Sequence, residues 1–291
     1  MKRKWNVKTA AILAAITAAA LTGCGGQNTE ETTDTGNATE PTVVKVGIVG
    51  DLVEPWEVIN ELLADEGIQV ELVTFSDYNT PNQALDAGDV DLNAFQHYAF
   101  LNDEVEKKGY QIEAIGNTII GPMNLYSKSI SSPDELQKGD KIAIPNDVTN
   151  GGRALKALES AGLIKVDPAA GYTPDVYDVT ENPLSLEFVE ADAATLVSLL
   201  PDVAAAVINN NYAFDNGLDL EKDAIFTESV ETIADDNPYI NIIAARSEDK
   251  DNPVYQKIVD AYHTDEVAKV LLDTYHGVYQ PVWDYTYEEA E

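Results

Sequence analysis

The sequence predicts an α/β protein of two lobes with a cleft between them, and three observations support this fold class. Short apolar segments alternate with segments of helical spacing from Val43 onward, which is typical of parallel sheets covered by helices. Two strand-like segments, near 117–127 and at 238–246, are placed to cross between two groups of such units. A chain of 291 residues, 44% of them hydrophobic, is long enough for two domains with cores of their own.

The elements of the first half follow from the local apolar pattern. Trp56 and Ile59 have helical spacing behind Pro55, and the segment 68–75 alternates as a strand does. The same reasoning, applied along the chain, predicts strands at 43–50, 68–75, 90–95 and 112–128, helices at 55–64, 82–87 and 98–108, and a helix start at 132–135.

The second half repeats this alternation. We expect strands at 141–147, 186–191, 203–209 and 238–246, and helices at 153–160, 193–200, 253–262 and 265–276. With the two crossovers, lobe one comprises 43–121 plus 242–291 and lobe two comprises 122–241. Open α/β sheets bind ligands beyond the carboxyl ends of their strands, so the cleft between the lobes is the expected site.

The amino terminus predicts a lipid anchor. Residues 1–23 contain four basic residues, no acidic residue and an apolar run of about a dozen residues, which is too short to span a bilayer. The run ends in Leu21-Thr22-Gly23-Cys24, which resembles the bacterial lipobox. We therefore expect 1–23 to be a signal peptide and the thiol of Cys24 to carry the lipid; the alternative is a buried thiol. Residues 24–42 have almost no apolar side chain, and we expect a disordered tether that holds the protein at the extracytoplasmic face of the cell membrane.

Composition excludes several functional classes. The formal charge of −33 would repel a phosphate backbone, so a nucleic-acid partner is not expected. A single cysteine rules out an intramolecular disulfide and a multi-cysteine metal site. His97, His263 and His276 do not have metalloprotease spacing, and no G-x-S-x-G motif is present. We expect neither catalysis nor a metal or cofactor.

Four segments carry a resemblance to a known family. The segments 75–97, 144–155, 206–213 and 238–246 follow one another as in the NlpA/MetQ family of methionine-binding lipoproteins of ABC importers, which the chain resembles from Val43 to Trp283. The resemblance implies the two-lobed periplasmic-binding-protein fold and L-methionine as the ligand, with D-methionine or a related amino acid as alternatives. It also implies delivery to an ABC permease with a cytoplasmic ATPase. We expect the protein to be a monomer.

One arginine suits the α-carboxylate of an amino acid. Arg153 follows Thr149-Asn150-Gly151-Gly152, which predicts a strand-to-helix loop with Arg153 in the first helical turn. A guanidinium can hold a carboxylate with two hydrogen bonds, although a surface salt bridge is the common alternative. Asn150 is either a helix cap or a ligand contact.

Three asparagines suit the ammonium group, because an amide oxygen accepts hydrogen bonds without adding charge. Asn209 and Asn211 follow the apolar strand 203–209, and Asn241 interrupts the apolar segment 238–246. Each could instead be a turn residue, which is our interpretation of Asn210.

An aromatic group suits the thioether of methionine. Aromatic rings attract a polarisable sulfur by about 0.3–1.5 kcal/mol per contact, so an aromatic pocket favours methionine over leucine. The candidates are Tyr78, Phe95, His97 and Phe100, which in the family face the ligand. The alternative is that the phenylalanines and His97 belong to the core. Phe100 stands where the family usually has tyrosine, so the side-chain end of the site differs from the family pattern.

Two other interpretations of the function remain. A lipoprotein of this fold could bind a different small amino-acid-like ligand. A surface adhesin would also explain the anchor and the acidity, but it would not explain why polar residues converge on one cleft.

Overall fold

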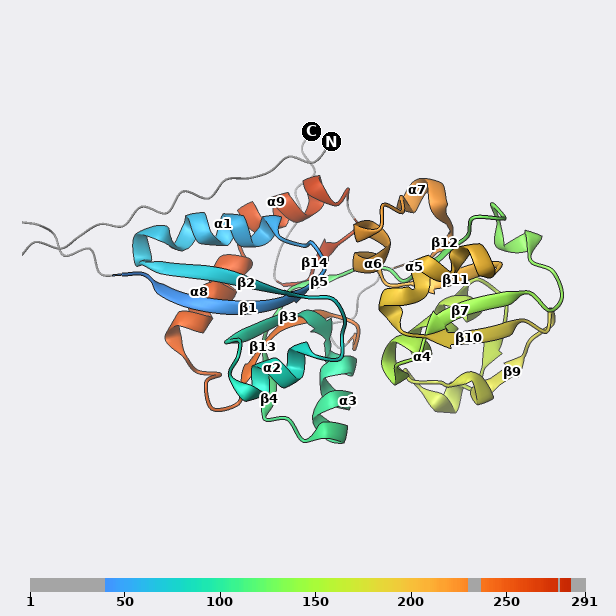
Figure 1. Ribbon diagram of the computed structural model, residues 1–291, viewed down its shortest axis with the longest axis horizontal. Helices are drawn as coiled ribbons and strands as arrows, with labels where there is room; N and C mark the ends of the chain where they lie inside the picture. Colours follow the sequence, from blue (N-terminus) through green and yellow to red (C-terminus); the bar gives the residue numbers. More distant parts are fainter. Residues whose placement is uncertain (1–39, 230–236, 277, 284–291) are drawn as a thin grey trace, which may run out of the picture. The chain divides into compact units, whose positions relative to one another are not determined.

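Figure 1 shows the computed structural model of the chain, which describes residues 40–229, 237–276 and 278–283. The predicted signal peptide, Cys24 and the tether as far as residue 39 lie outside these residues. Thr42, which we had placed at the end of the tether, already belongs to strand β1 (Thr42–Val49), because it pairs with Ile68 of the neighbouring strand. No helix in the described ranges is long and apolar enough to cross a bilayer.

The first sheet has the strand order β2-β1-β3-β13-β4. Its strands are β1, β2 (Ile68–Phe75), β3 (Leu92–His97), β4 (Ile112–Asn117) and β13 (Asn241–Arg246). The helices of this lobe are α1 (Glu54–Leu63), α2 (Pro81–Ala87), α3 (Tyr98–Lys108), α8 (Pro253–Tyr262) and α9 (Asp265–Thr274).

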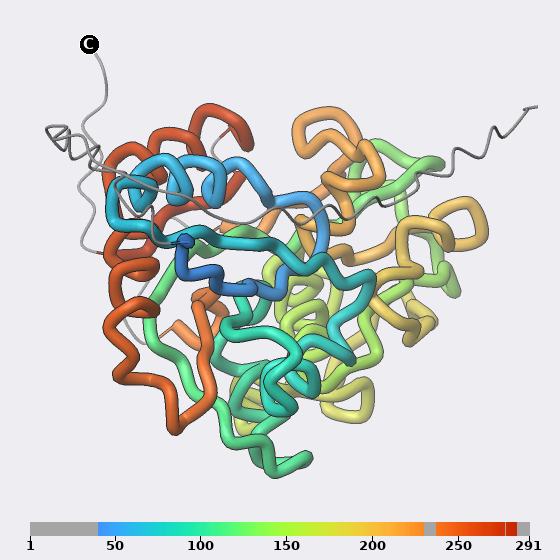
Figure 2. The backbone as a smooth tube through the Cα atoms, turned by 60° about the vertical axis from the view of Figure 1, so that its left-hand side comes forward, coloured from blue at the N-terminus to red at the C-terminus, as the bar shows by residue number. Residues whose placement is uncertain are grey.

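The two faces of this sheet have separate cores. Trp56 and Ile59 of α1 pack with Ile258 of α8 and Leu271 of α9 against β1, so the last helices of the chain lie beside the first (Figures 1 and 2). The opposite face is covered by α2 and α3, and its core includes Leu85 and Leu101.

The second sheet has the strand order β10-β7-β11-β6-β12. Its strands are β6 (Asn124–Tyr126), β7 (Lys141–Pro145), β10 (Glu187–Ala191), β11 (Ala205–Ile208) and β12 (Ala224–Thr227). The helices of this lobe are α4 (Val148–Ser160), α5 (Leu196–Leu199), α6 (Asn210–Asp215) and α7 (Leu220–Asp223). The described residues also form two separate two-stranded sheets: β5 (Ile119–Ile120) with β14 (Gln280–Pro281), and β8 (Lys165–Val166) with β9 (Val179–Glu181).

The sheets are mixed, whereas the alternation of elements predicted parallel ones. β1, β2 and β3 are parallel, as are β7, β10 and β11, but β13 and β6 run antiparallel to their neighbours. Both exceptions follow a crossover. Each begins at the end of the sheet where a parallel strand finishes: Asn241 pairs with His97, and Asn124 pairs with Ile208. A chain that enters a lobe at that end must run against the strands that finish there. The two-lobed fold with two crossovers is therefore confirmed, while the lobe boundaries stay a prediction.

Several predicted elements have other bounds. The segment 112–128 is three short strands, because the chain leaves one sheet and enters the other around Pro122. The helix start at 132–135 is a single 3-10 turn, and 193–200 is a short helix between two such turns. The strand predicted from 238 begins at Asn241, after a turn. Helix α4 begins five residues before Arg153, at Val148.

Candidate functional site

A cavity lies where the parallel strands of both sheets end. It is lined by the ends of β1 and β3, the first turns of α4 and α6, and the crossover segments around Gly121 and Asn241. All nine residues predicted to contact a ligand line it: Tyr78, Phe95, His97, Phe100, Asn150, Arg153, Asn209, Asn211 and Asn241. The structure thus brings the predicted residues together, and their contacts with a ligand stay a prediction.

Arg153 does not lie in the first turn of its helix. Asp147 caps α4 by accepting a hydrogen bond from the backbone N–H of Asn150, and Arg153 follows in the second turn. Arg153 is therefore not next to the free backbone N–H groups at the start of the helix. The side chain is nonetheless buried, with 6% of it exposed.

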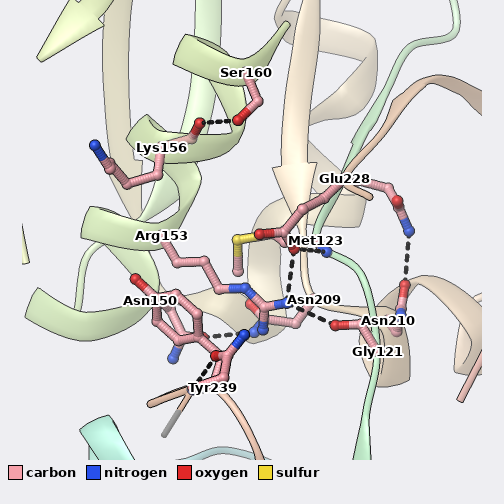
Figure 3. A network of polar contacts seen from close by, with 12 residues as sticks. Gly121, Met123, Asn150, Arg153, Lys156, Ser160, Asn209, Asn210, Glu228 and Tyr239 are labelled. Carbon is pink, nitrogen blue, oxygen red and sulfur yellow. Dashed lines mark hydrogen bonds and ion pairs between the residues drawn. The ribbon is translucent and has the colours of Figure 1, made fainter. Parts of the chain in front are cut away.

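The guanidinium of Arg153 is held from several sides (Figure 3). Nη2 donates to the carbonyl oxygen of Gly121 at 2.7 Å and to Oε2 of Glu228 at 2.7 Å, and Cζ lies 4.6 Å from the ring centre of Tyr239. Nε is buried and has no hydrogen-bond partner among the described residues. The Nε–H of a fixed guanidinium is therefore a buried donor that a ligand can use.

Asn150 and Asn209 form a relay that begins at Asp147. Asp147 Oδ1 accepts hydrogen bonds from the backbone and side-chain amides of Asn150 at 2.8 and 3.1 Å. Asn150 Oδ1 accepts in turn from Nδ2 of Asn209 at 2.7 Å. This fixes the orientation of both amides and leaves Oδ1 of Asn209 buried and without a partner in the described structure. Asn150 is thus not the cap itself but links the cap to Asn209, and the free oxygen of Asn209 is an acceptor suited to a cation.

His97 is neutral and offers a donor. Burial, and after it the positive charge of Arg153, lower the pKa of His97 to about 3. Nδ1 accepts the backbone N–H of Phe100 at 3.1 Å, so the ring proton is on Nε2. Nε2 is buried and makes no hydrogen bond of standard geometry within the described part of the chain, although the side chain of Asn150 lies near enough to affect the pKa of the ring.

The aromatic residues form one cluster. The ring centres of Tyr78, Phe95 and Phe100 are 6.0–6.1 Å apart pairwise, and Phe100 meets His97 edge to face. Tyr78 donates its hydroxyl to Oδ1 of Asn211 at 2.5 Å, and burial raises its pKa well above the usual value. The oxygen of Asn211 is thus already engaged, which leaves Asn209 as the better placed acceptor.

Sequence reasoning missed three residues at this site. Asn210, which we had read as a turn residue, is the buried first residue of α6; its Oδ1 accepts from Asn124 at 2.8 Å and its Nδ2 has no partner among the described residues. Glu228 and Tyr239 hold Arg153. Glu228 is one of 51 acidic residues and carries no local signal, whereas Tyr239, just before Asn241, could have been noticed as an aromatic at a crossover.

The charges of the lining are few. Among the described residues, Arg153 is the one lining side chain that carries a charge, because His97 is neutral and none of the described carboxylates lines the cavity. Across the described ranges, no group of three or more His, Cys, Asp or Glu is arranged to hold a metal ion. The arrangement can bind a small molecule that carries an acceptor, a cationic donor and an apolar end.

Comparison with known proteins gives consistent matches. A family model described as NlpA lipoprotein matches residues 44–283. The D-methionine-binding lipoprotein MetQ of Escherichia coli K12 is 43% identical over 272 residues, which are 92% of this chain and 95% of that protein. Outer membrane lipoprotein 2 of Mannheimia haemolytica is 37% identical over 274 residues, 94% of this chain and 98% of that protein.

Solved structures match as well. A nutrient binding protein from Burkholderia cenocepacia, bound to methionine, has a TM-score of 0.77 and 42% identity and covers 82% of this chain and 100% of its own. The substrate binding protein of a methionine transporter from Streptococcus pneumoniae has a TM-score of 0.77 and 38% identity, covering 83% of this chain and 96% of its own.

Proposed function

The chain belongs to the NlpA lipoprotein family, and on that premise we propose that it captures methionine outside the cytoplasm and delivers it to an ABC importer. The observation that carries the proposal is the set of buried polar atoms without partners in the described cleft, next to a cluster of aromatic rings. Each such atom costs about 1–3 kcal/mol when it is left unpaired. A bound molecule that satisfies them regains that free energy.

A zwitterionic amino acid can pair with two of these atoms in a single pose. Its α-carboxylate would accept from Nε of Arg153, and its ammonium would donate to Oδ1 of Asn209, with Asn241 as a further lining residue. Its side chain would lie among Tyr78, Phe95 and Phe100, whose rings favour a thioether. This pose uses six of the nine predicted residues, and Asn150 supports it by holding the side chain of Asn209.

The role of the protein would be binding alone, without catalysis. MetQ of Escherichia coli and the Streptococcus pneumoniae protein are named as binding proteins, and the cleft residues suit recognition of a ligand rather than a nucleophile–base pair. Closure of the lobes on the ligand would be what the permease detects. We propose that the protein acts as a monomer, anchored to the membrane through lipid on Cys24.

The second candidate is a related amino acid. The aromatic cluster has phenylalanine at position 100, where the resemblance to the family implies tyrosine, so the side-chain end of the pocket is the part open to change.

A ligand screen tests the proposal. Residues 25–291, freed of co-purified ligand by unfolding and refolding, would be heated with amino acids, nucleosides and sugars. A ligand at 100 times its dissociation constant stabilises the folded state by about 2.7 kcal/mol, so methionine should raise the melting temperature and sugars should not. No response to methionine, in protein shown to be refolded, would refute the proposal.

A further inference from the structure

Glu228 is the charged partner of Arg153, although it does not line the cavity itself. Oε2 of Glu228 lies 2.7 Å from Nη2 of Arg153 and accepts the backbone N–H of Met123 at 2.8 Å. Arg153 and Met123 line the cavity, but Glu228 does not. Figure 3 shows Glu228 approaching the guanidinium from the side of Met123, with Gly121 on another side.

The pair is nearly enclosed, with 6% of the Arg153 side chain and 19% of the Glu228 side chain exposed. A charge in such a place is costly unless a partner balances it, and removing one partner leaves the other uncompensated. Since Arg153 is the one charged side chain among the described lining residues, Glu228 balances its charge and brings the sum over the described cleft residues to zero.

A ligand carboxylate need not displace Glu228. Nη2 has two hydrogens, and they are used by Gly121 and Glu228, whereas Nε is unpaired among the described residues. The carboxylate of the ligand and that of Glu228 can therefore share Arg153 from different directions. One guanidinium then balances only one of the two carboxylates, and the second needs another cation.

We propose that Glu228 is a resident counter-charge that makes the cleft select zwitterionic ligands over anionic ones. This inference rests on the proposed function. An α-ammonium brings its own charge, so methionine leaves the occupied cleft neutral. The same molecule without the ammonium leaves one negative charge buried.

The test compares methionine with 4-(methylsulfanyl)butanoate, which has hydrogen in place of the ammonium group. Calorimetric titration of wild type and Glu228→Gln gives two affinity ratios, and the hydrogen bonds lost with the ammonium are common to both. Glutamine keeps the size of the side chain and an oxygen for Met123 while removing the charge. We expect the preference for methionine to narrow at least fivefold in Glu228→Gln, mainly through tighter binding of the anion. Glu181→Gln, which breaks an exposed pair with Lys165, should leave the ratio unchanged.

The other outcomes are distinct. The inference is overturned if the preference for methionine over the anion narrows less than fivefold in Glu228→Gln. It is also overturned if both ligands gain affinity equally in this variant, which would mean that Glu228 competes with the ligand carboxylate. If wild type does not bind methionine at all, the proposed function itself fails.

A second measurement does not depend on the folding of Glu228→Gln. Binding of the anion to the wild-type cleft should be accompanied by an uptake of protons, which calorimetry detects as a binding heat that changes with the ionisation heat of the buffer. Binding of methionine should be accompanied by a smaller uptake of protons. Equal uptake for both ligands contradicts a resident counter-charge.

Discussion

Single atoms in the cleft define what it can hold. Arg153 Nε and His97 Nε2 are donors, Asn209 Oδ1 is an acceptor, and none has a partner in the described part of the protein. Another atom of each side chain makes a hydrogen bond within the protein. Arg153 is held by Glu228 and Gly121, His97 by the backbone of Phe100, and Asn209 by Asn150. Side chains held in this way lose little freedom when a ligand arrives, which favours affinity.

His97 makes stability depend on pH. Its pKa is about 3 in the folded protein and 6.5 in a model peptide, so the unfolded chain binds an extra proton between these values. The contribution is complete above pH 6.5 and is lost as the pH falls toward 3. At about 1.4 kcal/mol per pH unit, His97 should account for a loss of about 2 kcal/mol at pH 5.

Urea unfolding at pH 7.5 and pH 5 measures this loss. His97→Asn keeps an acceptor that can cap α3 but does not titrate, so its stability should fall by about 2 kcal/mol less than that of wild type over the same interval. Equal losses in the two proteins would show that His97 is not kept neutral by the fold.

Phe95 and Tyr78 should control which side chain is preferred. Phe95→Ala or Tyr78→Ala removes aromatic contacts worth about 0.3–1.5 kcal/mol each with sulfur, so methionine should lose up to about tenfold of its advantage over leucine and norleucine. Competitive titration with the three amino acids measures the ranking. Phe214→Ala is the matched control, because Phe214 is 46% exposed and outside the cavity lining. An unchanged ranking in both cleft variants would place the ligand side chain elsewhere.

At the scale of elements, periodic patterns predicted most of the fold and local signals misplaced some boundaries. The strand 68–75 and the helices 98–108 and 253–262 have the predicted bounds, because their apolar spacing spans the whole element. Helix α4 begins earlier than predicted because Gly151 and Gly152, which suggest a loop in a single sequence, lie inside the helix. Gly151 lies close to the carbonyl oxygen of Pro145, and Gly152 lies close to residues 172–174, which no local pattern connects to it.

The same limit applies to the site. The residue types for both ends of an amino acid could be recognised from motifs, since they cluster after strands. Glu228 could not, because its ion pair with Arg153 joins residues 75 positions apart that no local pattern connects.

Gly152 should be essential to the position of α4. A Cβ at this residue would lie 2.8 Å from Cα of Thr173 and 3.0 Å from the carbonyl oxygen of Tyr172, so the helix or the 172–174 segment must move. Alanine is favoured over glycine in a free helix by about 1 kcal/mol, yet Gly152→Ala should destabilise the protein by about 1–3 kcal/mol. Thermal or urea unfolding measures the change. Ser160→Ala, on the exposed end of the same helix, should stay within about 0.5 kcal/mol. A stabilised Gly152→Ala would contradict the close approach.

At the scale of the whole molecule, anchoring and binding should be separable. Cys24 lies in the amino-terminal segment and the cleft in the body that begins at β1, so Cys24→Ser should abolish lipidation and leave the affinity for methionine unchanged. Membrane fractionation and mass spectrometry of the amino terminus measure the anchor, and titration measures the affinity. An unmodified Cys24 in membrane-extracted wild-type protein would contradict the lipobox interpretation.

The acidic charge of −33 belongs to the same scale. None of the carboxylates in the described ranges lines the cavity, so we assign the excess negative charge to the solubility of the protein.

The most direct test of the account is calorimetric titration of L-methionine into ligand-free wild type and Arg153→Ala. A charge-assisted contact in a cleft that excludes water is worth about 2–4 kcal/mol, so the variant should bind roughly thirty- to a thousand-fold more weakly. Because Arg153→Ala also leaves Glu228 unpaired, the double variant Arg153→Ala/Glu228→Gln serves as its control and should remain weak. Micromolar or tighter binding by wild type with this loss in both variants is the predicted result; methionine affinity within threefold of wild type in Arg153→Ala would contradict it.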